Sequence, residues 1–363
     1  MGDRGNVLLR WADRYLGIPL VWACGLGVRK KPVPEKPERI GILATAAIGD
    51  SLLLSPVLKD LQKALPQSEI VLFCGNSIKG IMGMTLEGFK LVIIPVKNPF
   101  KAARIIRREK FDLFIDCGPW PRLNSLLAFF SHSSCRIGFN SIKQYRHYVY
   151  HIPVDHRNDC HELENLRRLI APLGIKSASL PVLGQAEPSV VDAYAVVHMF
   201  PSGYKASFKE WSDDRWIRLI DGLTKENIPV FITGGPADGG AAERIISQCR
   251  DKGLIRNGAG KYSLKETGEY LRKATLVVSV NTGIMHMAAA YGQALIALHG
   301  PTSVLRWGPV SGDAINFCAT TTSAGCLHLG FEYDKRDPRS LDTIDPDEVL
   351  KAALELWAQR RFP

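Results

Sequence analysis

The sequence lacks the patterns that define several well-known classes of protein. None of its eight cysteines forms a Cys-x-x-Cys pair, and several lie in apolar runs, which is typical of buried thiols in a reducing compartment. Cys318, Cys326 and His328 have no fourth ligand in the pattern, so we expect no zinc or other metal site. Zinc-finger, recognition-helix and RNP-type aromatic patterns are missing too, so nucleic acid is not an expected partner.

A secretory signal and a membrane-spanning run are also missing. The apolar run at 16–28 contains Pro19 and several glycines and is too short, because a spanning helix needs about 20 apolar residues. The preceding residues form a helical stripe opposite a charged one; the stripe is Val7, Leu8, Trp11, Ala12, Tyr15 and Leu16, and the charged residues are Arg4, Arg10, Asp13 and Arg14. With Arg29-Lys30-Lys31 behind it, the extension 1–38 suits either a membrane interface or a helix packed on its own domain. The pattern does not decide between them.

Positive charge is concentrated in the N-terminal half. The chain has a net charge of +10. Residues 1–39 hold eight Lys/Arg and four Asp/Glu, and residues 97–147 hold ten Lys/Arg and three Asp/Glu, which gives +4 and +7. This distribution suggests an anionic lipid surface or an anionic acceptor, although a solvated charged face is a common alternative.

After the extension, apolar runs alternate with helical patterns in two series. The predicted strands are 40–44, 69–74, 91–95, 112–116, 135–139, 193–199, 229–234, 254–257, 275–279, 294–299 and 314–318. The predicted helices are 49–65, 100–110, 122–131, 161–173, 213–226, 240–250, 263–273, 282–291 and 346–360. A turn-rich linker at 174–189 separates the series. The alternation predicts an α/β protein with two Rossmann-like doubly wound domains, 39–180 and 181–345, that face a central cleft, with a C-terminal helix in 346–363.

One candidate site follows the apolar run 275–279. There Asn281-Thr282-Gly283 leads into an Ala-rich helix, so free backbone N–H groups and the positive end of a helix dipole meet at one point. Such a turn favours a phosphate group, and His286 is spaced to add a donor. An ordinary strand-to-helix corner is the alternative.

A second candidate site follows the first predicted strand. Asp50 comes at the start of the helix after 40–44. It is either a structural N-cap or a carboxylate at the strand edge where ligands bind in open α/β sheets, and both roles can hold together.

Taken together, five motifs in order give the chain a resemblance to glycosyltransferase family nine, the lipopolysaccharide heptosyltransferase family. They are Ile48-Gly49-Asp50 with Pro56, Lys209-Glu210-Trp211, Thr233-Gly234-Gly235-Pro236-Ala237-Asp238, Asn281-Thr282-Gly283 with His286, and His299-Gly300-Pro301-Thr302. The resemblance covers roughly residues 39–355 and implies the GT-B fold. It leaves the extension outside.

The resemblance also implies roles for individual residues. Asp50 matches the catalytic base, and Lys209 matches the lysine that holds the donor's diphosphate without a metal. Asp238 takes the place near the donor ribose. Thr282, Gly283 and His286 match the phosphate-binding turn. Trp211 is expected to pack the Lys209 loop.

Two positions depart from the family pattern. The usual Asp-Thr-Gly is Asn281-Thr282-Gly283 here, so a charge expected near the donor sugar is replaced by an amide. Ala44-Thr45 also stands where a basic residue is common. Both departures bear on the donor sugar and the acceptor more than on the reaction.

We therefore expect an inverting, metal-independent glycosyltransferase with no cofactor. It would move a sugar, heptose from ADP-heptose, onto a lipopolysaccharide-core or other lipid-linked saccharide on the inner face of the inner membrane, as a peripheral cytoplasmic protein. A nucleotide-sugar epimerase of the same fold is one alternative, and it would turn over donor alone. The other is a non-catalytic sugar-nucleotide-binding assembly protein, which Asn281 favours and Asp50 with Lys209 disfavours.

Overall fold

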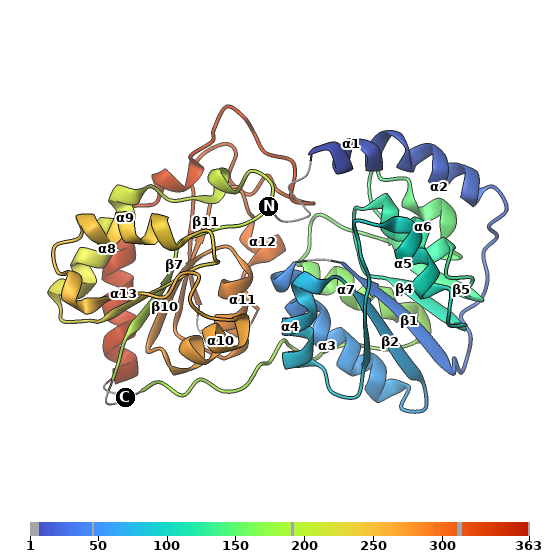
Figure 1. The fold of residues 1–363 in the computed structure, drawn as a ribbon, viewed down its shortest axis with the longest axis horizontal. Coiled ribbons are helices and arrows are strands. Elements are labelled where there is room, and N and C mark those ends of the chain that lie inside the picture. The colour runs from blue at the N-terminus through green and yellow to red at the C-terminus, as the bar shows by residue number, and fades with distance from the viewer. Residues whose placement is uncertain (1–6, 46, 190–191, 311–313, 362–363) are drawn as a thin grey trace. The chain divides into compact units, whose positions relative to one another are not determined.

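The computed structural model describes residues 7–45, 47–189, 192–310 and 314–361. The chain divides into two compact units, residues 1–180 and 181–363, which Figure 1 shows in blue to green and in green to red. Within the described ranges, no helix is both long enough and apolar enough to cross a membrane.

Unit 1 (residues 1–180) is built on a six-stranded parallel sheet in the order β3-β2-β1-β4-β5-β6. The strands are β1 (Arg39–Ala44), β2 (Glu69–Cys74), β3 (Lys90–Ile93), β4 (Leu113–Asp116), β5 (Cys135–Asn140) and β6 (Ile152–Asp155). The helices are α1 (Val7–Tyr15), α2 (Gly17–Gly25), α3 (Ile48–Ala64), α4 (Lys79–Thr85), α5 (Pro99–Ile106), α6 (Arg122–Phe129) and α7 (Glu162–Ile170). Because helices cover both faces, the central strands are almost entirely buried and apolar.

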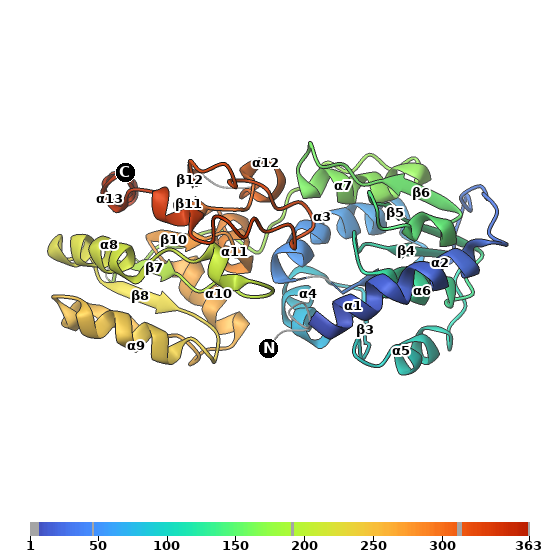
Figure 2. The ribbon, with the colours of Figure 1, turned by 90° about the horizontal axis from the view of Figure 1, so that it is seen from above.

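Helices α5 and α6 cover one face of this sheet, and α2 packs outside α6 (Figure 2). The core on that face joins sheet residues such as Phe73 and Phe114 to Ala102 of α5, Leu127 of α6 and Val21 of α2. Helices α3 and α7 pack against each other on the opposite face.

Unit 2 (residues 181–363) repeats the design with a parallel sheet in the order β12-β11-β10-β7-β8-β9. Its strands are β7 (Ala195–His198), β8 (Val230–Thr233), β9 (Ile255–Asn257), β10 (Leu276–Val280), β11 (Leu295–His299) and β12 (Ala314–Cys318). Its helices are α8 (Asp213–Lys225), α9 (Gly239–Gln248), α10 (Leu264–Lys273), α11 (Gly283–Ala290), α12 (Val304–Trp307) and α13 (Pro346–Arg361). Helix α13 lies against α8 so closely that a Cβ atom at Gly222 would come within 2.2 Å of Leu350.

Both sheets follow one topology. Renumbered within each unit, the strand order is 3-2-1-4-5-6, in which the chain reverses direction between the first and the fourth strand. Ligands of open α/β sheets bind outside the carboxyl ends of the strands at this switch point. The loops that matter therefore follow β1 and β4 in unit 1, and β7 and β10 in unit 2.

The described part of the N-terminal extension contains two helices. Its apolar run at 16–28 includes the second of them, α2, whose Gly17 and Val21 are buried. Asp13 of α1 faces inward to Arg122, with 3.0 Å between Asp13 Oδ2 and Arg122 Nη1. The aromatic side faces solvent, with Trp11 and Tyr15 exposed by 59% and 55%. Arg4 lies outside the described residues.

Candidate active site

The phosphate-type turn of unit 2 lies at the carboxyl end of β10, on the switch point. Thr282 is the N-cap of α11, and the helix's first backbone bond runs from His286 N to Thr282 O. The N–H groups of Gly283, Ile284 and Met285 therefore have no acceptor within the helix. Thr282 Oγ1 is buried and has no hydrogen-bond partner among the described residues. A buried hydroxyl beside three free N–H groups is the arrangement an anion completes.

Asn281, next to this turn, is held by the adjacent strand. Its Nδ2 lies 2.9 Å from Trp307 O and 3.0 Å from His299 Nδ1 at the end of β11. Burial lowers the pKa of His299 to about 4, so the ring is neutral at pH 7. His286, in the first turns of α11, is also buried.

Lys209 ends a short 3-10 helix (Ala206–Lys209) in the loop after β7, on the same switch point. Its Nζ donates to Ser202 O at 3.0 Å, which folds the side chain back over its own loop. Trp211, two residues after Lys209, is buried against Trp216 of α8, with ring centroids 4.9 Å apart.

Asp238 lies after β8, one strand beyond β7. It is the N-cap residue of α9, and its carboxylate Oδ2 accepts a hydrogen bond from Gly235 N at 2.7 Å. The bond closes the Gly234-Gly235 turn on itself. Asp238 thus has a structural role in the loop that follows β8.

In unit 1, Asp50 lies in the loop–helix corner after β1. Helix α3 begins at Ile48, so Asp50 is its third residue and not the N-cap that the sequence suggested. The carboxylate Oδ2 accepts a hydrogen bond from Ala47 N at 3.0 Å, which satisfies a backbone donor of the first turn. Asp50 is half-buried, so it combines a capping contact with access to solvent.

The loop after β4 is fixed by a buried polar cluster that the sequence did not reveal. Asp116 and Arg146 form an ion pair with no exposed side-chain surface, and Tyr150 Oη donates to Asp116 Oδ2 at 2.6 Å. Asp116 Oδ1 also accepts from Gly118 N at 2.9 Å. Asn124, at the start of α6, is linked to Thr45 after β1 by a bond of 2.8 Å. The two loops that border the switch point are therefore held together.

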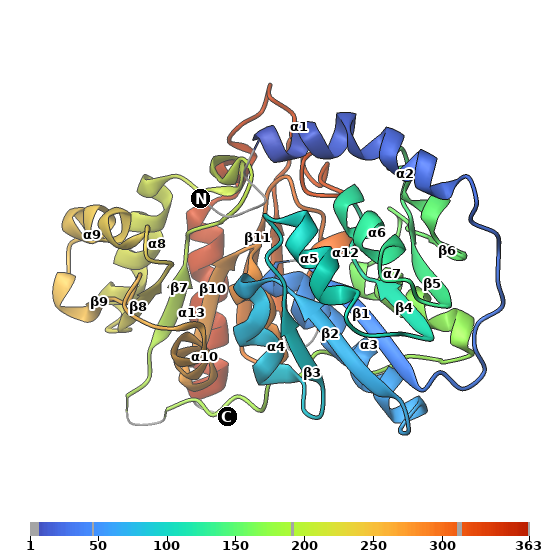
Figure 3. The same cartoon turned by 45° about the vertical axis from the view of Figure 1, so that its right-hand side comes forward.

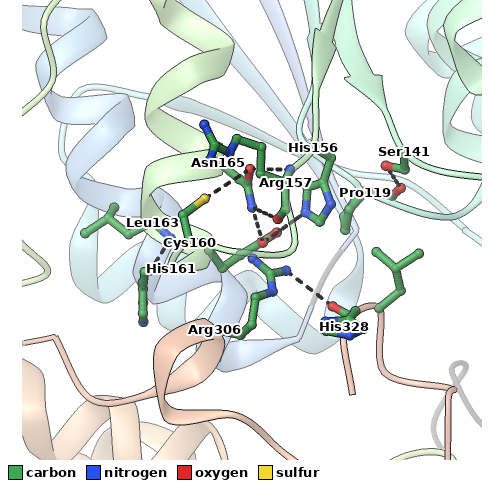
Figure 4. A network of polar contacts seen from close by, with 12 residues as sticks. Pro119, Ser141, His156, Arg157, Cys160, His161, Leu163, Asn165, Arg306 and His328 are labelled. Carbon is green, nitrogen blue, oxygen red and sulfur yellow. Dashed lines mark hydrogen bonds and ion pairs between the residues drawn. The ribbon is translucent and has the colours of Figure 1, made fainter. Parts of the chain in front are cut away.

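Figure 4 shows a second buried network of unit 1, after β6. His156 Nε2 lies 3.0 Å from Glu162 Oε2, and Asn165 Nδ2 bonds the same carboxylate oxygen at 3.2 Å. Asn165 also accepts from Arg157 N at 2.9 Å. The pattern His161-Glu162-Leu163-Glu164-Asn165 at a helix start was its only sequence signal, because polar residues on a buried helix face need partners.

The structure thus assigns the candidate residues to two sets. Lys209, Asp238, Asn281, Thr282 and Gly283 belong to loops at the carboxyl edge of the unit 2 sheet, with His286 in the helix that follows. Asp50 belongs to the corresponding edge of unit 1. Among the described residues no three His, Cys, Asp or Glu side chains are grouped to hold a metal ion.

Comparison with known proteins gives consistent matches. The family model "Glycosyltransferase family 9 (heptosyltransferase)" matches residues 100–335, more than half of the chain. Lipopolysaccharide heptosyltransferase 3 of Escherichia coli K12 is 24% identical over 343 residues, which cover 85% of this chain and 95% of that protein.

Solved structures agree at the level of the fold. E. coli ADP-heptose lps heptosyltransferase II has a TM-score of 0.70 at 19% identity, over 88% of this chain and 99% of that chain. E. coli heptosyltransferase WaaC with ADP has a TM-score of 0.69 at 19% identity, with the same two shares.

Two doubly wound units with these neighbours define the GT-B fold. The family match is more specific. The chain belongs to glycosyltransferase family 9, the heptosyltransferase family, and is a glycosyltransferase.

Proposed function

We propose that this protein transfers heptose from ADP-heptose to a lipopolysaccharide-core or other lipid-linked saccharide, with inversion and without a metal. The observation that carries the proposal is the turn at Thr282. Its buried hydroxyl, which has no partner among the described residues, and the N–H groups that have no acceptor within α11 suit the diphosphate of a nucleotide sugar.

In the proposed reaction, Asp50 removes the proton from the acceptor hydroxyl as that oxygen attacks the anomeric carbon. The bond from the anomeric carbon to the diphosphate oxygen breaks, and ADP leaves with the bonding electrons. Charge grows on the diphosphate during this step, so the Thr282 turn and the Lys209 ammonium stabilise the transition state more than the bound donor. These cationic and dipolar groups are the reason that no metal is required.

The donor and acceptor are inferred from relatives. One relative that matches over most of the chain is named for lipopolysaccharide heptosyl transfer, and one similar structure holds ADP. Asp238, close to the turn after β8, is proposed to lie near the donor ribose. Asn281 is proposed to face the donor sugar with its amide oxygen, because its nitrogen is engaged by Trp307 and His299.

We further propose that the protein is peripheral on the inner face of the inner membrane. Helices α1 and α2 present large exposed apolar side chains, namely Trp11, Tyr15, Leu16, Leu20, Trp22 and Leu26. Exposed Arg29 and Lys30 follow them. Aromatic residues with a basic flank favour the interface of an anionic membrane.

The test is a donor panel with a defined heptose-acceptor core oligosaccharide, in EDTA. We expect ADP release only with ADP-heptose and acceptor together, a product heavier by one heptose in mass spectrometry, and an inverted anomeric configuration by NMR. Turnover of donor alone to an isomer would show an epimerase. Binding of ADP-heptose without either product would show a sugar-nucleotide-binding protein.

A further inference from the structure

Unit 1 contains a large apolar groove that the proposed chemistry does not use. It has a volume of about 1010 Å³ and is lined by residues of α1, α2, α5 and α6. Helix α6 lies beside both α2 and α5 (Figures 2 and 3). Its apolar walls include Leu16, Leu20, Phe100, Ala103, Leu123 and Leu127. Phe100 is 89% exposed and Leu16 and Leu20 are more than half exposed, which is a costly arrangement for a surface that stays in water.

The rim of this groove is basic. Arg104, Arg107 and Arg108 of α5 and the turn after it line it and are exposed. The described residues provide no carboxylate ion pair for these three guanidinium groups. Asp13, a carboxylate of the opposite wall, is already neutralised by Arg122. Apolar walls with a cationic rim match a molecule with a hydrocarbon chain and an anionic head, because arginine pairs well with phosphate.

The groove also reaches the candidate catalytic edge. Thr45, Gly118 and Asn124 line it, and they belong to the loops after β1 and β4 that border the switch point. Asp50 follows Thr45 by five residues, in the first turn of α3, and does not itself line the groove. A lipid in the groove would therefore have its head near the side chain that we propose as the base. A lipid that carries the reacting saccharide must bring its head group to Asp50, whereas an ordinary bilayer lipid need not.

We propose that the groove binds an acyl chain of the acceptor glycolipid, and that the arginines bind a phosphate of the same lipid. The inference rests on the proposed function, which supplies a lipid-linked acceptor. It assigns the N-terminal extension a part in acceptor selection, because α1 and α2 form one wall. Acylated and deacylated forms of one acceptor should then differ in KM.

The first experiment measures KM for both forms with ADP-heptose. The wild type should have a KM about tenfold or more lower for the acylated acceptor. Ala103→Phe, which fills the groove from α5, should bring the ratio of the two KM values to about one. Ala12→Phe fills it from α1 and serves if the first variant does not fold. Ala64→Phe at the exposed end of α3 is the matched control and should keep the wild-type ratio. A wild-type ratio near one, or a ratio that survives both fillings, would overturn the proposal.

The rim is tested on the same assay. Arg104→Gln with Arg108→Gln should raise KM about tenfold for the acylated phosphorylated acceptor and far less for its dephosphorylated form. Lys101→Gln on α5 is the matched control, since Lys101 does not line the groove. Equal effects on both acceptor forms would show that the arginines do not bind a phosphate of the acceptor.

A binding measurement separates this inference from the proposed function. Wild-type protein is sedimented with phosphatidylethanolamine vesicles that contain lipid A, an acylated and phosphorylated glucosamine disaccharide, or a charge-matched amount of phosphatidylglycerol. We expect preference for lipid A, which Ala103→Phe abolishes, even if no sugar transfer is detected. If Ala103→Phe weakens binding to both vesicles equally, the groove holds a bilayer lipid and the assignment to the acceptor is wrong.

Discussion

Asn281 donates a hydrogen bond to His299, with 3.0 Å between Asn281 Nδ2 and His299 Nδ1. The other ring nitrogen, Nε2, lies 3.0 Å from Asn316 Oδ1. The network assigns the proton to Nε2, because an amide oxygen only accepts. Burial lowers the pKa of His299 to about 4, which is consistent with a neutral ring. An amide at position 281 can donate to both His299 and Trp307 O, whereas the carboxylate of the usual family motif cannot.

Asn281→Asp should therefore destabilise unit 2. A carboxylate would meet the carbonyl of Trp307 and the lone pair of His299 Nδ1, which leaves two buried acceptors without a donor. We expect a loss of about 1–3 kcal/mol in the free energy of unfolding at pH 7.5. The loss should shrink at pH 5.5, because a protonated His299 restores a donor. Urea unfolding at the two pH values checks this, with Asn76→Asp on an exposed turn as control. A loss of stability that does not depend on pH would contradict the hydrogen bond between residue 281 and His299.

Thr282→Val tests the turn. The hydroxyl has no partner in the described residues, so its removal should leave stability unchanged or slightly raised. Affinity for ADP should nevertheless fall by about 10- to 100-fold, since a hydrogen bond to a charged group contributes about 1.5–3 kcal/mol. Calorimetric titration with ADP in EDTA measures the affinity. Thr320→Val, at an exposed position, is the control. Unchanged ADP affinity would mean that the turn is a structural corner.

Much of this fold was predictable, because a parallel sheet covered on both sides leaves long apolar runs. Every strand of unit 2 was predicted within two residues at each end, and β2 was predicted without error. The edge strand β6 was missed because Ile152–Asp155 alternates apolar and polar residues and contains a proline. Helices α4 and α12 were missed because they are short and lack the periodicity on which prediction depends.

In the candidate sites, too, some features could be predicted from the sequence and others could not. Loops after strands place Asp50, Lys209 and Thr282 at sheet edges, and this follows from sequence because topology fixes where strands end. The contacts of Asn281 with His299 and Trp307 join residues from separate segments, so no local pattern predicts them. The groove was missed for a related reason: it depends on the packing of α1 through Asp13 against Arg122, a residue of a distant segment.

Asp50→Asn separates catalysis from capping. The amide oxygen of Asn can still accept from Ala47 N, so only the charge near the helix N-terminus is lost, which contributes about 0.3–1 kcal/mol. Turnover should fall by about 10² or more if the carboxylate is the base. Single-turnover kinetics and urea midpoints are compared with those of Asp347→Asn in the first turn of α13. Near-normal turnover in Asp50→Asn would leave the residue with a capping role alone.

Stability should fall in mild acid because of buried neutral histidines. Burial lowers the pKa of His198 and His299 to about 4, while the unfolded chain has values near 6.5. Between these values the unfolded state binds more protons, so stability is full above about pH 6.5 and is lost as pH falls toward 4. Each histidine should account for a loss of up to about 3 kcal/mol.

The measurement is the urea midpoint between pH 7.5 and 4.5. His198→Asn removes one of these titrations, so its stability should depend less steeply on pH, although it starts lower because the contact with Thr233 is weakened. His132→Gln, on an exposed turn, should retain the wild-type slope. If the urea midpoint of His198→Asn depends on pH as steeply as that of the wild type, the pKa of His198 is not lowered in the folded protein.

Membrane attachment is best tested without deleting the extension. Val21 of α2 is fully buried in the unit 1 core, so removal of residues 1–38 would destabilise the unit and confuse the result. Trp11→Ser with Trp22→Ser changes only exposed side chains, and stability should change by less than about 0.5 kcal/mol. Binding to phosphatidylglycerol vesicles, measured by sedimentation, should weaken several-fold. Adding Arg29→Gln and Lys30→Gln should weaken binding further, and more at low salt than at high salt, since each cation near an anionic surface contributes about 1 kcal/mol. Phe208→Ser in unit 2 is the control. Unchanged binding in the tryptophan variant would show that α1 and α2 serve unit 1 alone.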